Sequence, residues 1–412
     1  MSYDYNCNGN LEVISMGKIL VVNAGSSSLK YKLYEMPEEE VICSGIAERI
    51  GHQDAIFRLK FNGDSIKTVL PIETHTKAVE LLLDALIVHK VIANFNDIKA
   101  VGHRVVQGGK YYSNSVFFDD DVVAKVESLI DLAPLHNGPN LIGMQAFKKV
   151  LPHIPNVATF DTAFHRTMAE VDAIFPIPYE LTQDYDIRRY GFHGTSHQYL
   201  DQEGRKYLPG IEHPKIITCH IGSGASIAAI KDGKCVATSM GLTPLGGIMM
   251  GTRTGDIDPS VVYFLCKKLD KSVDEVYEIL NKKSGLLGVS GVSNDSRDVL
   301  KAIESGNPRA LLADQLFNRR IADYIGQYFV RLGGADLIIF SAGIGENSAY
   351  FRSKVIEEIG PALGVKIDET INESSRGVSV LLSTPDSKVK VALIPTDEEV
   401  MIARDTYHLI SK

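Results

Sequence analysis

Short apolar runs alternate with longer amphipathic stretches along most of the chain, a pattern typical of α/β proteins. Two of the apolar runs, Ile19–Val22 and Ile216–Ile221, stop at turns rich in glycine and serine. After each turn, apolar and polar positions alternate with the period of a strand. Each segment is therefore predicted to fold as a strand, a turn and a second strand. A P-loop or a Rossmann fingerprint would continue into a helix instead.

The two turns, Asn23–Ser28 and Gly222–Ser226, contain the residue types that bind phosphate through the backbone. Glycine carries no Cβ, so a phosphate oxygen can approach its N–H group closely. The turns lie about half the chain apart, which suggests two similar halves that face each other across a cleft. One such turn would be an ordinary hairpin connection as readily as a phosphate site. The pair favours an enzyme that handles phosphate.

Helical periodicity appears between the strand patterns. Apolar positions three and four residues apart predict helices over Thr76–Lys90 and over about Arg309–Leu332, where a glycine pair follows. Ser272 and Glu275 have the spacing of a capping box, which predicts the start of another helix. Helices interleaved with strands in this way indicate layered α/β domains.

A third glycine loop, Ser341–Asn347, follows the buried-strand pattern Leu337–Phe340 and precedes a further helix pattern. Strand–glycine–helix arrangements of this kind hold part of a nucleotide near a helix N-terminus. A tight connection within an α/β unit is the alternative interpretation.

Composition and charge narrow the class of protein. The 412 residues, 44% of them hydrophobic and 23% charged, suggest a globular protein of two or three domains. The formal net charge of −8 argues against a nucleic-acid partner, which normally requires a basic surface. No apolar run is long enough to span a bilayer, so no membrane partner is expected. The five cysteines are scattered without a CxxC pair, which indicates neither disulfides nor zinc and fits a cytoplasmic location. Residues 1–16 lack a signal-peptide pattern and are interpreted as a disordered extension.

Four short segments carry polar side chains that a protein core would not favour. Their central residues are Arg104, Asp161, His193 and Arg253. Phosphoryl transfer requires cations on the phosphoryl oxygens, a metal bridge and in-line positioning of the reactants. A single arginine or histidine would more often be a surface or core residue. The combination of all four beside phosphate-binding turns predicts a phosphoryl-transfer enzyme.

From about Gly17 onwards, the chain resembles the family of acetate kinases and their close relatives, the propionate and butyrate kinases. The resemblance lies in nine motifs: Asn23–Lys30, Gly102–Arg104, Ala133–Asn137, Phe160–His165, Tyr190–His197, Thr238–Gly241, Met250–Arg253, Ala342–Asn347 and Pro395–Glu399.

The resemblance implies an α/β fold of the actin, sugar-kinase and heat-shock-70 superfamily. Such a fold has two ribonuclease-H-like domains, a duplicated actin-like ATPase architecture, facing a nucleotide cleft. The expected N-terminal domain comprises residues 17–161 and 400–412. The expected C-terminal, nucleotide-binding domain comprises residues 162–399. The resemblance also implies a homodimer.

Four catalytic roles follow from the resemblance. Arg104 and Arg253 are expected to hold the carboxylate or acyl phosphate and to neutralise charge on the migrating phosphoryl group. Asp161 is expected to orient or deprotonate near the attacking carboxylate and to help place the metal. His193 is expected to donate a hydrogen bond to the transferring group.

The resemblance also implies a metal cofactor and binding sites for two substrates. Mg²⁺, or Mn²⁺ in its place, is expected on Glu398 with Asn23 nearby, and Glu399 is the alternative ligand. The acyl pocket is expected from Val106, Leu135, Phe192 and Pro244. Residues expected to contact ATP or ADP are Lys30, His220, Gly222, Ser223, Gly224, Asp295, Ser296, Arg297, Gly343, Ile344, Gly345 and Asn347.

The expected reaction is reversible, direct in-line transfer of the ATP γ-phosphoryl group to acetate, giving acetyl phosphate and ADP. Two alternatives remain open: a propionate or butyrate kinase, and a non-enzymatic nucleotide-switch protein of the same superfamily. Gln107, Ser223, Ser296 and Gly246 depart from residues that are usual in the family. Ser223 and Ser296 fall among the expected nucleotide contacts, which leaves a phosphoryl donor other than ATP open.

Overall fold

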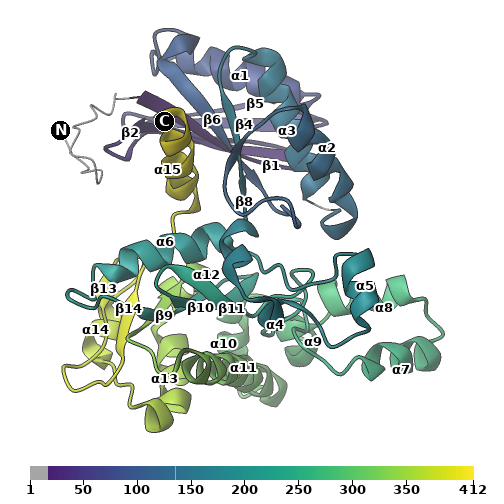
Figure 1. The fold of residues 1–412 in the computed structure, drawn as a ribbon, viewed down its shortest axis with the longest axis vertical. Coiled ribbons are helices and arrows are strands. Elements are labelled where there is room, and N and C mark those ends of the chain that lie inside the picture. Colours follow the sequence, from purple (N-terminus) through teal and green to yellow (C-terminus); the bar gives the residue numbers. More distant parts are fainter. Residues whose placement is uncertain (1–16, 135) are drawn as a thin grey trace. The chain divides into compact units, whose positions relative to one another are not determined.

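The computed structural model describes residues 17–134 and 136–412 (Figure 1). The predictions made for residues 1–16 and for Leu135 lie outside this described part. The chain divides into two compact units, Met1–Ala163 with Asp397–Lys412, and Phe164–Thr396. Glu398 and Glu399 thus belong to the first unit, together with the rest of the C-terminal helix.

A mixed sheet forms the first unit, with the strand order β5-β4-β3-β2-β1-β6-β8-β7. The strands are β1 (Gly17–Gly25), β2 (Ser28–Met36), β3 (Glu40–Glu48), β4 (His52–Phe61), β5 (Asp64–Ile72), β6 (Ile98–Val105), β7 (Val116–Phe117) and β8 (Asn156–Phe160). The helices are α1 (His75–Val88), α2 (Asp120–Ser128), α3 (Asn137–Val150) and α15 (Glu398–Ile410), with 3₁₀ turns at Phe95–Asp97 and Ile130–Leu132.

The core of this unit lies between the sheet and helices α1 and α3. Leu20, Leu29 and Leu33 of the sheet pack in one buried cluster with Leu82 of α1 and Phe147 of α3. Helix α15 packs against β1, β2 and β6. Alternation along the strands leaves Lys30 and Lys32 of β2 off the core face, because side chains point to opposite sides in turn.

The sheet of the second unit has the strand order β11-β10-β9-β12-β14-β13. Its strands are β9 (Lys215–Ile221), β10 (Ala225–Lys231), β11 (Lys234–Thr238), β12 (Leu337–Ser341), β13 (Val380–Leu381) and β14 (Lys390–Leu393). Its helices are α4 (Glu170–Ala173), α5 (Tyr179–Asp184), α6 (Gly194–Arg205), α7 (Ser260–Leu269), α8 (Val273–Lys282), α9 (Gly285–Ser290), α10 (Ser296–Glu304), α11 (Pro308–Leu332), α12 (Ala342–Asn347), α13 (Ala349–Leu363) and α14 (Glu369–Ser374). A 3₁₀ turn spans Ala163–Thr167.

Both sheets are built on the same strand pattern. In the first unit, β1, β2 and β3 form an antiparallel meander, and β6 and then β8 add in parallel beside β1. In the second unit, β9, β10 and β11 form the meander, and β12 and then β14 add in parallel beside β9. The shared order is a duplication of one core, as the paired turns in the sequence predicted.

The predictions for the two glycine turns, for one helix start and for one helix end are confirmed. Both glycine turns join two antiparallel strands, β1 to β2 and β9 to β10. The capping box at Ser272 and Glu275 is present at the start of α8. Helix α11 ends at Gly333, whose φ of +64° is the left-handed conformation of a C-terminal glycine. The four cysteines in the described part of the chain are free. No helix of that part is long and apolar enough to cross a bilayer.

Candidate active site

In the first unit, Arg104 and Asp161 form a partly buried ion pair with two parallel hydrogen bonds. Arg104 lies near the end of β6, and Asp161 directly follows the neighbouring parallel strand β8, so both emerge at the same sheet edge. Arg104 Nε lies 3.0 Å from Asp161 Oδ1, and Arg104 Nη2 lies 2.7 Å from Oδ2. Asp161 is 1% exposed. A fork of this kind fixes the guanidinium plane as well as its position.

Glu398 is the second acid at this arginine. It is the first residue of α15, and its Oε2 lies 3.9 Å from Arg104 Nη2. Burial raises the pKa of Glu398 to about 6, against the opposing effect of Arg104 and with the added repulsion of Asp161, Glu399 and Asp397. The three side chains therefore form a cluster in which one cation balances more than one acid.

Two asparagines that the sequence analysis missed hold the loop after β6. Asn140 Oδ1 accepts from Val106 N at 3.1 Å, and Asn137 bonds both N and O of Gln107 at 3.0 Å. β6 ends at Val105, so strand alternation does not set the direction of the Val106 side chain. Val106 is 6% exposed. The motif Ala133–Asn137 was the available signal, since it ends on one of these asparagines.

Asn23, Lys30 and Lys32 of the sheet and Glu399 of α15 line a cavity of about 300 Å³. Lys32 Nζ lies 3.4 Å from Glu399 Oε2 and 3.7 Å from Asp397 Oδ1. Glu399 is thus engaged by a lysine, whereas Glu398 lies at Arg104. The choice of Glu398 over Glu399 as the carboxylate that accepts a metal stays a prediction.

The donor set of the first unit suits Mg²⁺. This ion prefers oxygen ligands and is usually held by one or two carboxylates together with waters and substrate phosphates. Glu398 and Asp161 supply carboxylate oxygens, and Asn23 supplies an amide oxygen. The described residues contain no cluster of three or more ionisable ligands, of the kind that encloses a metal entirely in protein.

In the second unit, Arg253 is partly buried and has no carboxylate partner within ion-pair distance among the described residues. Its Nη1 donates to Pro244 O at 3.3 Å and approaches Met250 Sδ at 3.6 Å. Burial lowers the pKa of Arg253, and Tyr277 opposes that shift. A guanidinium in this state gains from any anion that approaches it.

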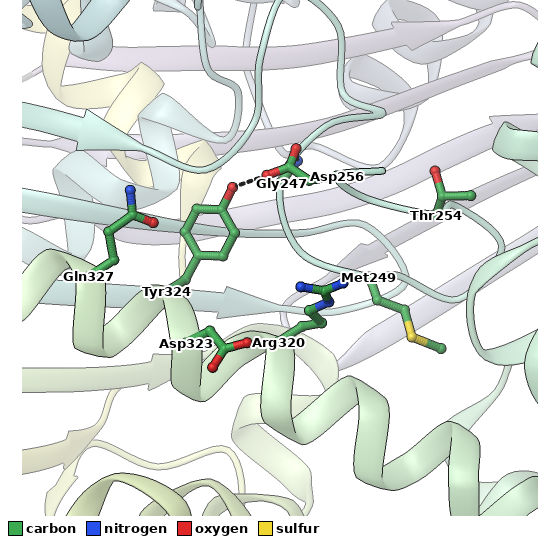
Figure 2. Close-up of a pocket in the computed structure, with 8 residues that line it drawn as sticks. All are labelled: Gly247, Met249, Thr254, Asp256, Arg320, Asp323, Tyr324 and Gln327. Carbon is green, nitrogen blue, oxygen red and sulfur yellow. Dashed lines mark hydrogen bonds between the residues drawn. The ribbon is translucent and has the colours of Figure 1, made fainter. Parts of the chain in front are cut away.

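The loop that carries Arg253 is held in place by contacts on two sides. Gly285, at φ +63°, passes so close to the loop that a Cβ there would lie 2.0 Å from Met250 O. On the other side, Asp256 Oδ1 accepts from Gly247 N at 2.7 Å, and Tyr324 of α11 donates to Asp256 Oδ2. Figure 2 shows this contact at the edge of a cavity of about 230 Å³ between the loop and α11. Asp256 and Tyr324 were not assigned from the sequence, although Asp256 closes the motif around Arg253.

His193 faces the same spot as Arg253. It caps α6 in the left-handed conformation, φ +57°, which is uncommon for a residue with a Cβ and often marks a functional site. A Cβ placed on Gly224 would lie 3.5 Å from Arg253 Nη1 and 3.6 Å from His193 Nε2. The ring of His193 stacks on His220 with centroids 4.1 Å apart. Because residue 224 is a glycine, Arg253 Nη1 and His193 Nε2 face a space that no side chain of this residue fills.

The second glycine turn and the third glycine loop come together in this unit. A Cβ on Gly222 would lie 3.8 Å from Gly343 N at the start of α12, and Ser223 O accepts from Gly251 N at 3.4 Å. Ile344, Gly345 and Asn347 complete α12, where Asn347 Nδ2 donates to Gly343 O at 2.9 Å. The loop predicted over Ser341–Asn347 is therefore mostly a short helix.

Glu346 is a further residue of this loop that sequence reasoning missed. Its Oε1 accepts from Ala342 N at 2.8 Å and from Thr396 N at 3.1 Å. Ala342 has φ +62°, so Glu346 stabilises a strained backbone beside the glycine turn. The motif Ala342–Asn347 contains Glu346 and was the signal available.

Asp295 and Arg297, expected near the adenosine, form their own pair at the start of α10. Asp295 caps the helix by accepting from Arg297 N at 2.9 Å, and its carboxylate also receives Arg297 Nε at 3.0 Å. The Arg297 side chain is 83% exposed, and Ser296 lies between the two as the first helical residue. Asn294 O, one residue earlier, lies 3.0 Å from where a Gly251 Cβ would be, which joins this segment to the Arg253 loop.

Of the expected acyl-pocket residues, Val106 belongs to the first unit, and Phe192 and Pro244 belong to the second. Phe192 is 2% exposed, and its backbone oxygen accepts from His165 Nε2 at 3.0 Å.

The family model of the acetokinase family matches residues 18–404 of this chain. The chain belongs to the acetokinase family. It is 51% identical to the acetate kinase of Geobacillus sp. (strain WCH70) over 395 residues, which are 96% of this chain and 99% of that protein. The resemblance found in the sequence motifs is thus confirmed.

Solved structures of acetokinase-family members match the fold as well. The acetate kinase of Porphyromonas gingivalis has a TM-score of 0.91 at 46% identity and covers 96% of this chain and 100% of its own. The propionate kinase of Francisella tularensis subsp. tularensis SCHU S4 has a TM-score of 0.89 at 39% identity, with 95% and 100% covered. The predicted fold class, two duplicated α/β cores, is confirmed by these likenesses.

Proposed function

We propose that this protein is an acetate kinase that transfers the γ-phosphoryl group of ATP to acetate, reversibly, giving acetyl phosphate and ADP. The observation that carries the proposal is the identity of about half of all residues to acetate kinases over nearly the full length of both chains. It is supported by the two half-sites, because each presents an arginine and a further polar group suited to phosphoryl transfer.

The reaction needs little covalent help from the protein. A carboxylate oxygen of acetate attacks the γ-phosphorus, and the bond from that phosphorus to the oxygen of the ADP leaving group breaks. The main barrier is repulsion between two anions, which positioned cations reduce. Both arginines supply such charge, one from each unit.

In the first unit, Arg104 binds the carboxylate of acetate while Asp161 fixes the direction of the guanidinium. In the second unit, Arg253 and His193 donate to the oxygens of the transferring phosphoryl group, since both nitrogens face Gly224. His220 and the turn Gly222–Gly224 contact the neighbouring phosphates. Lys30 adds a further positive charge on the first unit.

Glu398, Asp161 and Asn23 are the residues that would hold Mg²⁺. When bound, this ion neutralises charge on the phosphate oxygens. Burial is the main cause of the raised pKa of Glu398, and repulsion from Asp161, Glu399 and Asp397 adds to it. A bound cation would stabilise the ionised carboxylate against both effects. Mn²⁺ has similar ligand preferences and is expected to substitute.

Residues Asp295, Ser296 and Arg297 and the α12 residues are assigned to the adenosine of ATP. Their support is proximity, since the α10 and α12 starts both approach the loops that hold Gly251 and Gly222. Exposed Arg297 offers a flat guanidinium on which an adenine ring can stack.

Trapping of acyl phosphate with hydroxylamine tests the function directly. Purified protein with Mg²⁺ is given acetate, propionate or butyrate, each with ATP, GTP or pyrophosphate as donor. Fastest formation of the hydroxamate from acetate and ATP supports the proposal. No hydroxamate from any combination would contradict it and would favour a nucleotide switch without catalysis.

Propionate kinase is the second candidate, because a propionate kinase of known structure matches the chain over 95% of its length. The same assay separates the two. A higher kcat/KM for propionate than for acetate would assign the protein to that activity.

A homodimer is proposed on the basis of an apolar surface of the second unit. Tyr263 and Phe264 of α7 are 70% and 58% exposed, and Val273 and Tyr277 of α8 are 65% and 48% exposed. Large exposed apolar groups on adjacent helices are typical of protein interfaces. Sedimentation velocity should show a dimer that Phe264→Asp converts to a monomer.

We also place the protein in the cytoplasm, where its nucleotide substrate is available.

A further inference from the structure

A chain of three buried hydrogen-bonding side chains, Thr218, His197 and Ser226, ends on His193. Ser226 Oγ lies 2.8 Å from His193 Nδ1 and 2.8 Å from His197 Nε2. His197 Nδ1 lies 2.7 Å from Thr218 Oγ1. Thr218, His197 and Ser226 are each 0% exposed, so water does not take part in these bonds.

Sequence position explains why these groups meet. His193 and His197 are four residues apart and share one face at the start of α6. Thr218 and His220 are two residues apart on β9 and share one face of the sheet. Ser226 of β10 is paired directly with His220 in the hairpin register. The helix face thus lies on a patch of strand residues that all carry hydroxyl or imidazole groups.

The direction of the bonds follows from counting protons. A serine hydroxyl has one hydrogen, so Ser226 cannot donate to both imidazoles at once. Desolvation by burial holds the pKa of His197 well below its usual range, and His165 and His220 add to that shift. His197 is therefore neutral and has a single N–H. Only two arrangements of the chain satisfy every member, one running toward His193 and one running away from it.

His193 selects between the two. An anionic phosphoryl oxygen beside Gly224 requires a donor at Nε2, and the adjacent Arg253 disfavours a second positive charge on the ring. A neutral ring that donates at Nε2 must accept at Nδ1. Ser226 then donates to His193, His197 Nε2 donates to Ser226, and Thr218 donates to His197 Nδ1.

We propose that Thr218, His197 and Ser226 are positioning residues that hold His193 as the neutral tautomer with its proton on Nε2, aimed at the phosphoryl group. The inference rests on the proposed function, since the phosphoryl anion is what requires the Nε2 donor. Fixing the tautomer in advance removes the cost of reorganising the ring during the transfer. Serine or threonine at the links, in place of a carboxylate, keeps the site free of added negative charge that would repel phosphate.

A parallel arrangement holds the neighbouring ring. Ser196 Oγ lies 2.8 Å from His220 Nδ1 and 2.7 Å from Thr396 Oγ1. His220 stacks on His193 with an angle of 21° between the rings. Each stacked imidazole is therefore held at Nδ1 by a buried serine with a second polar partner. This pairing limits the rotation of both rings.

The test combines ¹⁵N NMR with kinetics on the full-length protein. Histidine is labelled with ¹⁵N, and the His193 signals are identified by their loss in His193→Gln. With saturating inorganic phosphate, His193 should carry its proton on Nε2 with Nδ1 unprotonated. Thr218→Val removes one hydroxyl at nearly constant shape, and Ser226→Ala removes the next one. In both variants the tautomer of His193 should become mixed, and kcat should fall about 10- to 100-fold with little change in KM.

Two controls separate positioning from packing. Thr218→Ser restores the hydroxyl and should restore both the tautomer and kcat. Ser290→Ala removes a similarly buried serine, 2% exposed, whose Oγ accepts from Val292 N at 3.1 Å, and should change neither. A wild-type His193 with its proton on Nδ1, or a tautomer and kcat unchanged in both Thr218→Val and Ser226→Ala, would overturn the inference. If the wild-type protein makes no acyl phosphate but the variants show these tautomer changes, the proposed function is refuted. The role of the hydrogen-bonded chain in fixing the His193 tautomer is then still supported.

Discussion

The two units present an arginine in opposite electrostatic states. Arg104 of the first unit is locked by Asp161 and approached by Glu398, so its charge is more than balanced within the protein. Arg253 of the second unit contacts only a backbone oxygen and a thioether sulfur among the partners described, and burial lowers its pKa. The sequence motifs had assigned both arginines the same role.

The difference separates positioning from charge supply. A guanidinium held by a buried carboxylate is a rigid directional hydrogen-bond donor, and the carboxylate already neutralises its charge. A partly desolvated guanidinium without a counter-ion remains a source of positive potential for a ligand. The first unit therefore suits an oriented carboxylate and a metal, and the second unit suits an anionic phosphoryl group.

The largest expected effect is on folding, through Arg104→Ala. This change leaves Asp161 buried without its counter-charge, and breaking such a pair costs about 3–5 kcal/mol of unfolding free energy. Urea denaturation followed by circular dichroism measures the loss. Arg404→Ala is the matched control, because Arg404 pairs with Glu39, whose side chain is 34% exposed against 2% for Asp161, and it should cost less than about 1 kcal/mol. Equal losses in the two variants would remove the distinction between a locked and an ordinary ion pair.

Arg253→Ala should do the reverse of Arg104→Ala, with a large effect on kcat and little effect on stability. Among residues 17–134 and 136–412, no carboxylate pairs with Arg253, so stability should stay the same or rise slightly. The rate should fall about 10²–10³-fold in kcat, about 3–4 kcal/mol, because one donor to the developing charge is lost. Arg319→Ala, on the exposed face of α11, serves as the control for removing one positive charge. A variant that melts lower yet keeps its kcat would assign Arg253 to structure instead.

The sequence predicted the fold well because its signals were local. Hairpins, the capping box at Ser272 and the glycine stop at Gly333 each depend on residues close in the chain. The tertiary partners of site residues were harder, since Asn140, Glu346 and Tyr324 act on backbone groups or residues distant in sequence. No periodicity encodes such contacts.

The state of the two arginines could not be predicted for the same reason. Motifs placed Arg104 and Asp161 in separate segments, and only the parallel pairing of β6 and β8 shows that they meet. The absence of a carboxylate near Arg253, within the described part of the chain, is likewise a property of packing. The hydrogen-bonded chain through Ser226 could be predicted in part from the sequence, because the hairpin register pairs Ser226 with His220.

The acid cluster of the first unit should give stability a pH dependence that Glu398→Gln removes. The folded-state pKa of Glu398 is raised to about 6 from an ordinary value of 4.5. Between these values the folded protein binds more protons than the unfolded chain. The contribution of Glu398 is therefore fully present below pH 4.5 and is lost as the pH rises through 6, by about 2 kcal/mol.

Urea denaturation from pH 4.5 to 7.5 measures this contribution as the difference between wild type and Glu398→Gln. Glu399→Gln controls for the loss of one negative charge at the start of α15. The buried His103, whose pKa desolvation lowers to about 4, contributes the opposite slope in both proteins and cancels in the difference. A difference that stays flat across this range would show that Arg104 already balances Glu398 fully.

The smallest expected effect concerns which acid the first unit accepts. If Arg104 donates its hydrogen bonds to the carboxylate of the substrate, the first residue of the loop after β6 should border the acyl group. That residue is Val106, whose backbone is held by Asn140. Removing two methyl groups makes room for one methylene, which is worth about 1–3 kcal/mol at most. Val106→Ala should therefore raise the kcat/KM of propionate relative to acetate several-fold, with ATP kinetics nearly unchanged. Val105→Ala is the matched control, because Val105 is 0% exposed in the hydrophobic cluster around Phe160, and it should lower stability without changing the ratio. An unchanged ratio together with a higher KM for ATP would make Val106 a packing residue, and Arg104 would then bind its anion without help from this loop.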